Sequence, residues 1–370
     1  MNAARLPVQR PADARLLVVD EDGGLVHAQR AFFIDFLAPG DLLVANDAAT
    51  LPASLAGIHV TSGAPIEVRL AARRSLDAHD VRHFDAVVFG AGDWRTRTED
   101  RPLPPALAPG DRLQLGPLSA WIEELLGHPR LVSLRFGDAP DAVWAGLAAH
   151  GKPIQYAHLA DRLRLWDVWT PIAGAPAAFE PPSAGFAIDW SALRRLRERG
   201  IGFATLTHAA GISSTGDPAL DRRLPLDEPY RIPAATAQAI RRTRARGGRV
   251  VAVGTTVVRA LEHAAARHGS VPAGEGLATQ RLGPATPLRI VDAVLSGTHE
   301  PGTSHHELLR AFIDDATLAH VDAALEQGGY RTHEFGDSVL VARSAAARAM
   351  RGDGRAADWV RAAQQRLMSA

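Results

Sequence analysis

The stretch GGRVVAVGTTVVRALE, residues 247–262, contains a strand pattern, a turn and the start of a helical pattern. Its three valines between positions 250 and 253 are typical of a strand that is covered on both faces. Gly254 then turns the chain, and Thr255 and Thr256 stand before the helical residues. A strand followed directly by a helix is the repeating unit of a mainly parallel α/β sheet, so this stretch predicts such a sheet.

The turn at Gly254 also predicts a binding site, because ligands of parallel α/β sheets lie beyond the carboxyl ends of the strands. The free N–H groups at the start of a helix favour a carboxylate or a phosphate. Arg259, one turn into the helix, would reach the same anion with its planar guanidinium. The alternative interpretation is an ordinary threonine cap beside an exposed arginine.

Strand and helix patterns alternate on both sides of this stretch, and the earliest strands belong to the same sheet. The expected strands are residues 16–19, 25–27, 42–45, 201–207, 250–253, 288–295 and 338–341. The expected helices are residues 190–199, 233–246 and 307–316.

Residues from about 58 to 152 have a different texture, with short alternating runs at 66–70, 86–89 and 131–136 between turns. Only residues 118–126 show a helical pattern there. Many short strands at this spacing predict a small β-barrel or sandwich, and the barrel is the form adopted in the prediction. The predicted fold is therefore α/β, with a barrel-like mixed α/β main domain (1–57 and 153–345), an inserted β-barrel domain (58–152) and a helical tail (346–370).

The composition is that of an ordinary globular protein, with 46% hydrophobic and 22% charged residues among 370. No apolar run reaches membrane-spanning length and the N-terminus lacks the pattern of a signal peptide, so we expect a cytoplasmic protein without membrane contact. The absence of cysteine excludes disulfides and thiolate metal sites. The net charge of +0 gives no argument for nucleic-acid binding, and arginine clusters at 194–199 and 241–249 are typical of solvated helix faces.

The run His305-His306-Glu307-Leu308-Leu309-Arg310 contains metal-binding residue types. It ends in arginine where a His-Glu-x-x-His zinc motif needs a second histidine. We therefore expect no metal. The oligomeric state has no sequence signal, and a monomer is the default expectation.

The opening stretch closely resembles the signature of the S-adenosylmethionine:tRNA ribosyltransferase-isomerase family of queuosine biosynthesis. Five further segments resemble that family in the same order, so the resemblance covers roughly residues 15 to 343. They are APGDLLVANDAATLPASLAG (38–57), EPPSAGF (180–186), LDEPYRI (226–232), IVDAVLSGTHEPGTS (290–304) and YRTHEFGDSVLV (330–341). The resemblance implies a two-domain fold with an inserted β-barrel.

The resemblance also implies a reaction. The ribosyl part of S-adenosylmethionine passes to the aminomethyl group of 7-aminomethyl-7-deazaguanine in tRNA, adenine and methionine leave, and an epoxycyclopentanediol forms on the base. S-Adenosylmethionine is then a substrate and tRNA a partner, and no metal or redox cofactor is implied. Such chemistry requires a base for the proton beside the sulfonium, an acid for adenine, and groups that orient the substrate.

The resemblance also implies site residues, at the positions of this sequence that match the family's motifs. They imply catalytic roles for Asp47, Glu228 and His299. The implied substrate-binding residues are Asn46, Ser183, His208, Tyr230, Thr255, Thr256, Arg259, Ser304, Gly336 and Asp337.

Several positions depart from the family's pattern. The Gly-x-Gly-Thr-Phe pattern after His208 survives only as Ala209-Ala210-Gly211, Ser296-Gly297-Thr298 replaces Thr-Asn-Phe, and Gly302 replaces a basic residue. Ala48 and Ala49 replace Thr-Arg, and Arg223 and Leu226 replace two histidines. Such losses predict weak or absent activity on the precursor tRNA with retained adenosyl binding, unless His208, His299 and His305 supply the missing groups. Two alternatives stay open: a transferase or lyase that acts on a small adenosyl or nucleoside substrate without tRNA, and a non-catalytic relative that binds a ligand or RNA.

Overall fold

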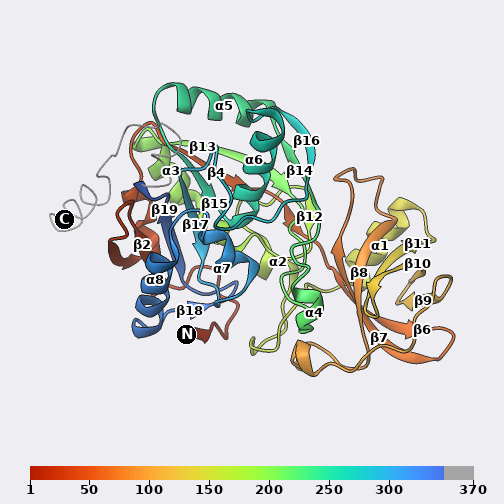
Figure 1. Cartoon of the computed structure of the whole chain (residues 1–370). Helices are drawn as coiled ribbons and strands as arrows, with labels where there is room; N and C mark the ends of the chain where they lie inside the picture. Colours follow the sequence, from red (N-terminus) through yellow and green to blue (C-terminus); the bar gives the residue numbers. More distant parts are fainter. Residues whose placement is uncertain (346–370) are drawn as a thin grey trace.

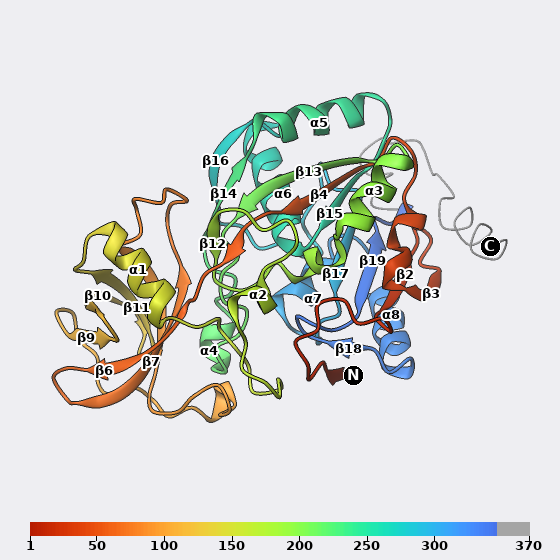
Figure 2. The ribbon, with the colours of Figure 1, turned by 180° about the vertical axis from the view of Figure 1, so that it is seen from behind.

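The computed structural model describes residues 1–345, and the tail predicted to be helical, 346–370, lies outside them. A large α/β part lies beside a smaller part built mainly of strands (Figures 1 and 2). Among the described residues, no helix has both the length and the apolar character needed to cross a bilayer.

A nine-stranded sheet forms the centre of the larger part, in the order β16-β14-β13-β4-β15-β17-β19-β2-β3. Its inner strands β13, β4, β15 and β17 are parallel, whereas β14, β16, β19 and β3 each make antiparallel pairs. The mixed α/β class is therefore confirmed, in an open sheet that ends at β16 and β3. The strands are β2 (Arg15–Val19), β3 (Leu25–Gln29), β4 (Leu42–Asn46), β13 (Gly202–His208), β14 (Glu228–Ile232), β15 (Val250–Val253), β16 (Gly274–Ala278), β17 (Ala293–Gly297) and β19 (Ser338–Ala342).

Helices cover both faces of this sheet, and β15 shows why its sequence is apolar throughout. Val250 and Ala252 belong to the core shared with α5, α6 and α8, while Val251 and Val253 belong to the core shared with α3 and η1. Alternate side chains of a strand point to opposite faces, so a strand between two helix layers must be apolar at every position. The helices are η1 (Arg30–Phe36), α3 (Trp190–Glu198), α5 (Ala234–Ala245), α6 (Thr255–His268) and α8 (Asp315–Gln327).

The smaller part is a closed antiparallel barrel in the order β10-β11-β8-β7-β6-β9, which confirms the predicted small β-barrel. Its core includes Val143 and Leu147 of α1 (Pro140–His150). The predicted boundary at residue 58 falls inside the first barrel strand, and we keep the division into two domains as a proposal. The barrel strands are β6 (Ser54–His59), β7 (Ala64–Ala72), β8 (His83–Phe89), β9 (Arg112–Leu115), β10 (Leu118–His128) and β11 (Leu131–Phe136).

Three sequence predictions of local structure are wrong. The helical pattern at 118–126 is strand β10, whose first half alternates buried and half-buried residues. The strand expected from residue 288 begins at Ala293, because the Glu262 carboxylate accepts the N–H groups of residues 289–291 at 2.6, 2.8 and 2.8 Å in place of a neighbouring strand. The helix expected at 307–316 is divided into α7 (Ser304–Leu309) and α8, where Asp314 caps the N–H of Thr317.

Closure of the barrel depends on a close backbone approach at Gly57 in β6. A Cβ atom at this position would collide with the carbonyl oxygen of Gln114 in β9. Overpacking of this kind costs about 1–3 kcal/mol. We expect Gly57→Ala to lower the free energy of unfolding by that amount, measured by urea denaturation. The matched control is Gly283→Ala, at a glycine with open space around its Cβ and without a positive φ. An unchanged midpoint for Gly57→Ala would contradict this account of barrel closure.

Candidate functional site

Asn46, at the end of β4, joins three elements at the carboxyl edge of the sheet. Its Oδ1 accepts the N–H groups of Ala48 and His208, both at 3.0 Å. Its Nδ2 donates to the His208 carbonyl at 2.9 Å and to Thr256 Oγ1 at 3.3 Å. The next residue, Asp47, accepts the Thr207 hydroxyl at 2.7 Å. Asn46 therefore holds β13 and the start of α6 in register, and its polar atoms are occupied by the protein itself.

Arg259 lies in the interior, with only 4% of its surface exposed. It forms an ion pair with Glu228 and donates to the carbonyls of Leu226, Ala278 and Gln280 at 3.0, 2.9 and 3.1 Å. The guanidinium that the sequence assigned to a substrate anion is thus engaged by internal partners. This geometry counts against its predicted role as a substrate anchor and favours a structural one.

Glu228 and His208 complete the buried network around Arg259. Glu228 accepts the N–H of Gly211 at 2.6 Å, and His208 Nε2 lies 3.5 Å from its carboxylate. His208 is fully buried and lies parallel to Tyr230, with ring centroids 6.5 Å apart. Burial and the charge of Arg259 lower the pKa of His208 well below its ordinary value. A neutral histidine at this depth supports packing more readily than proton exchange with a substrate.

Asp337 lies in the loop before β19, where its carboxylate binds Arg15 and Arg331. It is 1% exposed and accepts the backbone N–H groups of Arg15 and Arg331, each at 2.8 Å. Burial raises the pKa of Asp337, but these hydrogen bonds and Arg331 outweigh burial and hold it below its ordinary value. Its carboxylate therefore fastens the start of β2 to Arg331 and to the loop before β19. The neighbouring Gly336, also predicted as a site residue, donates its N–H to the His333 carbonyl at 2.9 Å.

A cavity of about 400 Å³ lies between the large sheet part and a loop of the barrel part. Of the predicted site residues, Ser183 and His299 line it, and Ser304 is the sequence neighbour of the lining residue Thr303. The lining residues are Arg97, Thr98, Glu99, Tyr156, Ala157, His158, Glu180, Pro181, Ser183, Ser213, Ser214, His299, Glu300, Thr303, His305, His333 and Glu334. A concave pocket rich in titratable groups is the best candidate for an active site.

The helix start singled out by the sequence lies close to this cavity. Gly254 has φ of +92°, and a Cβ atom there would lie 3.7 Å from the Cβ of Ala184. Ala184 follows the lining residue Ser183 in the short helix η3 (Ser183–Ala187). The free N–H groups of Thr255 and Thr256 are therefore near the cavity wall, although neither residue lines it.

The cavity contains two carboxylates whose pKa values are pushed apart. Glu180 is 7% exposed and accepts a hydrogen bond from the Tyr156 hydroxyl. Burial and the charge of Glu334 raise the pKa of Glu180 to about 7. Burial alone would raise the pKa of Glu334 as well. The nearby His158 and His333 outweigh this effect, so the pKa of Glu334 lies below its ordinary value. Such a pair is typical of sites that transfer protons.

Two pairs of stacked histidines face the same cavity. The ring centroids of His299 and His305 are 4.5 Å apart, and those of His158 and His333 are 4.3 Å apart. Burial lowers the pKa of His299 well below its ordinary value and that of His305 to about 4. Both are therefore neutral at physiological pH and present uncharged nitrogen atoms to a ligand.

Sequence reasoning missed Glu180, His158, His333 and Glu334. Glu180, His333 and Glu334 lie in segments that resemble the family, but no site role was assigned to them there, and His158 lies outside those segments. These segments meet only in the folded chain. The titratable content of segments 156–158 and 333–334 was visible, but nothing in the sequence placed them together.

The sequence matches the queuosine biosynthesis protein family over residues 1–341. The chain belongs to this family. An S-adenosylmethionine:tRNA ribosyltransferase-isomerase of Pelobacter propionicus is 33% identical over 91% of this chain and 95% of its own length. The protein of the same name from Azoarcus sp. is 34% identical over 92% and 94%. A solved S-adenosylmethionine tRNA ribosyltransferase from Thermotoga maritima has a TM-score of 0.48 and 24% identity over 91% of this chain and 95% of that chain.

Four of the positions at which this member of the queuosine biosynthesis family departs from the expected pattern, Ala48, Ala49, Arg223 and Leu226, do not line the cavity. Ala48 and Ala49 are buried, and Ala49 begins the short strand β5 (Ala49–Thr50), which pairs with β12 (Pro176–Ala178). Arg223 donates to the Leu126 carbonyl of the barrel at 2.7 Å, and Leu226 packs on an apolar cluster. These four residues therefore contribute no atom to the cavity wall of this protein.

Proposed function

We propose that this protein is an S-adenosylmethionine-dependent tRNA ribosyltransferase-isomerase of queuosine biosynthesis, with the 400 Å³ cavity as its active site. The observation that carries the proposal is the match with relatives of that name along more than nine-tenths of both chains. The substrate would be tRNA that carries 7-aminomethyl-7-deazaguanine, and this substrate implies a cytoplasmic location. A monomer stays the expectation.

In this proposal Glu180 is the general base and then the general acid of the reaction. Its carboxylate takes a proton from the carbon beside the sulfonium, and the resulting carboxylic acid returns that proton to the leaving adenine. A buried carboxyl with a pKa of about 7 suits both steps, because each form is accessible at neutral pH. The Tyr156 hydroxyl, which also lies 3.1 Å from the Ser214 carbonyl, fixes the orientation of Glu180.

The methionine carboxylate would lie at the start of α6. The N–H groups of Thr255 and Thr256 supply the positive end of a 14-residue helix. Ser183 lines the cavity and directly precedes Ala184, which lies near Gly254 at this helix start, so its hydroxyl would share the same anion. Arg259 then acts indirectly, because it holds Glu228, which fixes the loop at Gly211 that leads to the lining residues Ser213 and Ser214.

The tRNA base would enter between the barrel part and the sheet part. Arg97, Thr98 and Glu99 of the barrel part form one side of the cavity. Gly216 packs so closely on Thr98 and Glu99 that a Cβ atom there would collide with their backbone. This contact keeps the barrel loop against the loop that carries Ser213 and Ser214, and thus supports a shared site.

The test is to incubate the protein with S-adenosylmethionine and to measure adenine and methionine by mass spectrometry. We expect both products only when the tRNA carries the deazaguanine precursor, with tRNA that carries guanine at the same position as the matched control. Release of adenine without tRNA would instead support an enzyme of small adenosyl or nucleoside substrates. Binding of S-adenosylmethionine without any release would support a non-catalytic relative.

A further inference from the structure

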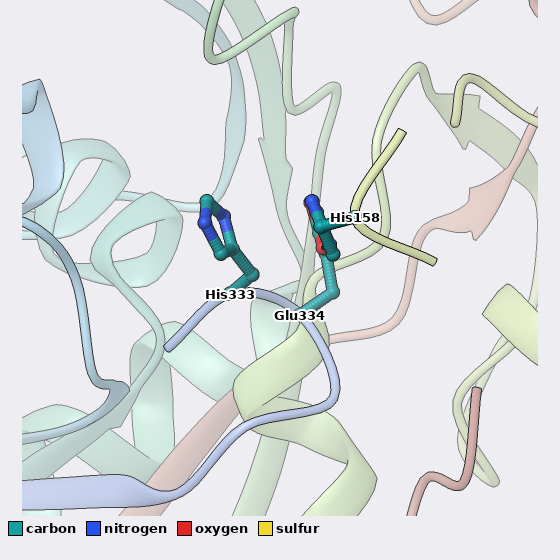
Figure 3. A group of neighbouring side chains, drawn as sticks. All are labelled: His158, His333 and Glu334. Atoms are coloured by element: carbon teal, nitrogen blue, oxygen red, sulfur yellow. The ribbon is translucent and has the colours of Figure 1, made fainter. Parts of the chain in front are cut away.

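His158, His333 and Glu334 form a cluster on the cavity wall, and the ligand atoms that they offer all lie within 4.8 Å of one another. His158 comes from the loop between α1 and α2 (Leu165–Val168), whereas His333 and Glu334 come from the loop between β18 (Arg331–Thr332) and β19. Figure 3 shows the two imidazole rings facing each other with the Glu334 carboxylate beside His158. Two segments far apart in the sequence thus bring three good metal ligands to one place.

Two of these ligand atoms have no hydrogen-bond partner among the described residues. They are Nε2 of His158 and Oε2 of Glu334, both inaccessible to solvent and 3.6 Å apart, which is too long for a hydrogen bond. A buried polar atom without a partner costs roughly 1–3 kcal/mol. A cation placed between the nitrogen and the oxygen would satisfy both atoms at once.

The backbone of His333 provides an independent observation. Among residues 1–345 it is the one non-glycine residue with a positive φ, at 70°. This left-handed conformation is unfavourable for a side chain with a Cβ atom, and such strain is typical of ligand-binding positions. Glycine would fit the turn without strain, so the histidine side chain is retained at a conformational cost.

We propose that His158, His333 and Glu334 bind one divalent transition-metal ion, with Zn²⁺ as the best fit. Two imidazoles and one carboxylate are a ligand set that Zn²⁺ uses when it keeps a position open for water or substrate. Zinc–ligand bonds of roughly 2.0–2.2 Å require the ligand atoms to lie about 3–3.5 Å apart, so side-chain rotations of about an ångström complete the site. The open position would face the cavity. This inference goes beyond the proposed function, whose reaction requires no metal.

Glu300 offers a fourth ligand. Its carboxylate lies 3.6 Å from Nε2 of His333 and it also lines the cavity. Because its side chain is about half exposed, it can reach or leave the ion without disturbing the core. The site would then have three fixed ligands and one exchangeable carboxylate.

The test measures metal binding alone, on the full-length protein after treatment with a chelator. We expect calorimetry to give one equivalent of Zn²⁺, and Co²⁺ to give a visible absorption band that Zn²⁺ abolishes. His333→Gly removes a ligand and suits the positive φ, so it should weaken binding at least 100-fold without lowering the melting temperature. Glu334→Gln should weaken binding similarly, and the matched control is His320→Ala, which removes an exposed histidine of α8.

Two outcomes would overturn the proposal. One is wild-type protein that gives no Co²⁺ band and no saturable Zn²⁺ binding. The other is binding that His333→Gly and Glu334→Gln leave as strong as in the His320→Ala control. Neither measurement involves S-adenosylmethionine or tRNA, so failure of the metal site and failure of the proposed function are distinguishable.

Discussion

Arg259→Ala should lower the free energy of unfolding by about 3–5 kcal/mol, the cost of removing one partner from a buried ion pair. The substitution leaves the Glu228 carboxylate without its cation in the interior. It also leaves the carbonyls of Leu226, Ala278 and Gln280 without this donor. The change should appear as a lower midpoint in urea denaturation and a lower melting temperature.

The matched control for this prediction is Arg194→Ala. Arg194 forms an exposed pair with Glu198 on α3, 3.2 Å apart, and such a pair contributes only about 0.3–0.5 kcal/mol. Arg259→Lys provides a milder variant if alanine prevents folding, because it keeps the charge and loses the planar fork. Unchanged stability together with weaker S-adenosylmethionine binding would restore Arg259 to the anchoring role that the sequence suggested.

Arg259 shows which features of this fold can be predicted from the sequence and which cannot. The strand, the Gly254 turn and the helix were predictable, because each depends on local pattern and on burial between two helix layers. The direction in which the Arg259 side chain points is decided by Glu228 and by the end of β16, which are remote in the sequence. The local sequence pattern therefore predicts the strand, the turn and the helix correctly, but it does not determine which groups Arg259 binds.

The cavity, too, could not be predicted from local sequence patterns. Its wall is assembled from segments near residues 97, 156, 180, 213, 299 and 333, which meet through the crossings of the sheet and the placement of the barrel. The family resemblance pointed to Ser183 and His299 within it. Glu180 precedes the recognisable Pro-Pro-Ser-Ala-Gly run by one step, yet its raised pKa comes from burial and from Glu334, which no local pattern reveals.

Glu180 carries the prediction with the largest effect on activity. Removal of a general acid or base typically lowers the rate by 10² to 10⁴-fold, so we expect Glu180→Gln to reduce kcat for adenine release on the precursor tRNA by about that factor. Because the carboxylate is the form that accepts the proton, the wild-type rate should fall as the pH drops through about 7. The variant should lose this dependence, and the exposed Glu198→Gln serves as the matched control.

The stability of the same variant separates a catalytic role from a structural one. Burial raises the pKa of Glu180 from 4.5 to about 7, so its favourable contribution to stability is complete below pH 4.5 and is lost as the pH rises through 7. Each pKa unit corresponds to about 1.4 kcal/mol, so above pH 7 the neutral glutamine should stabilise the protein by up to about 3 kcal/mol. A more stable and less active variant is therefore expected at pH 8. If Glu180→Gln raised the melting temperature but left kcat and its pH dependence unchanged, Glu180 would be a buried carboxyl without a part in the reaction.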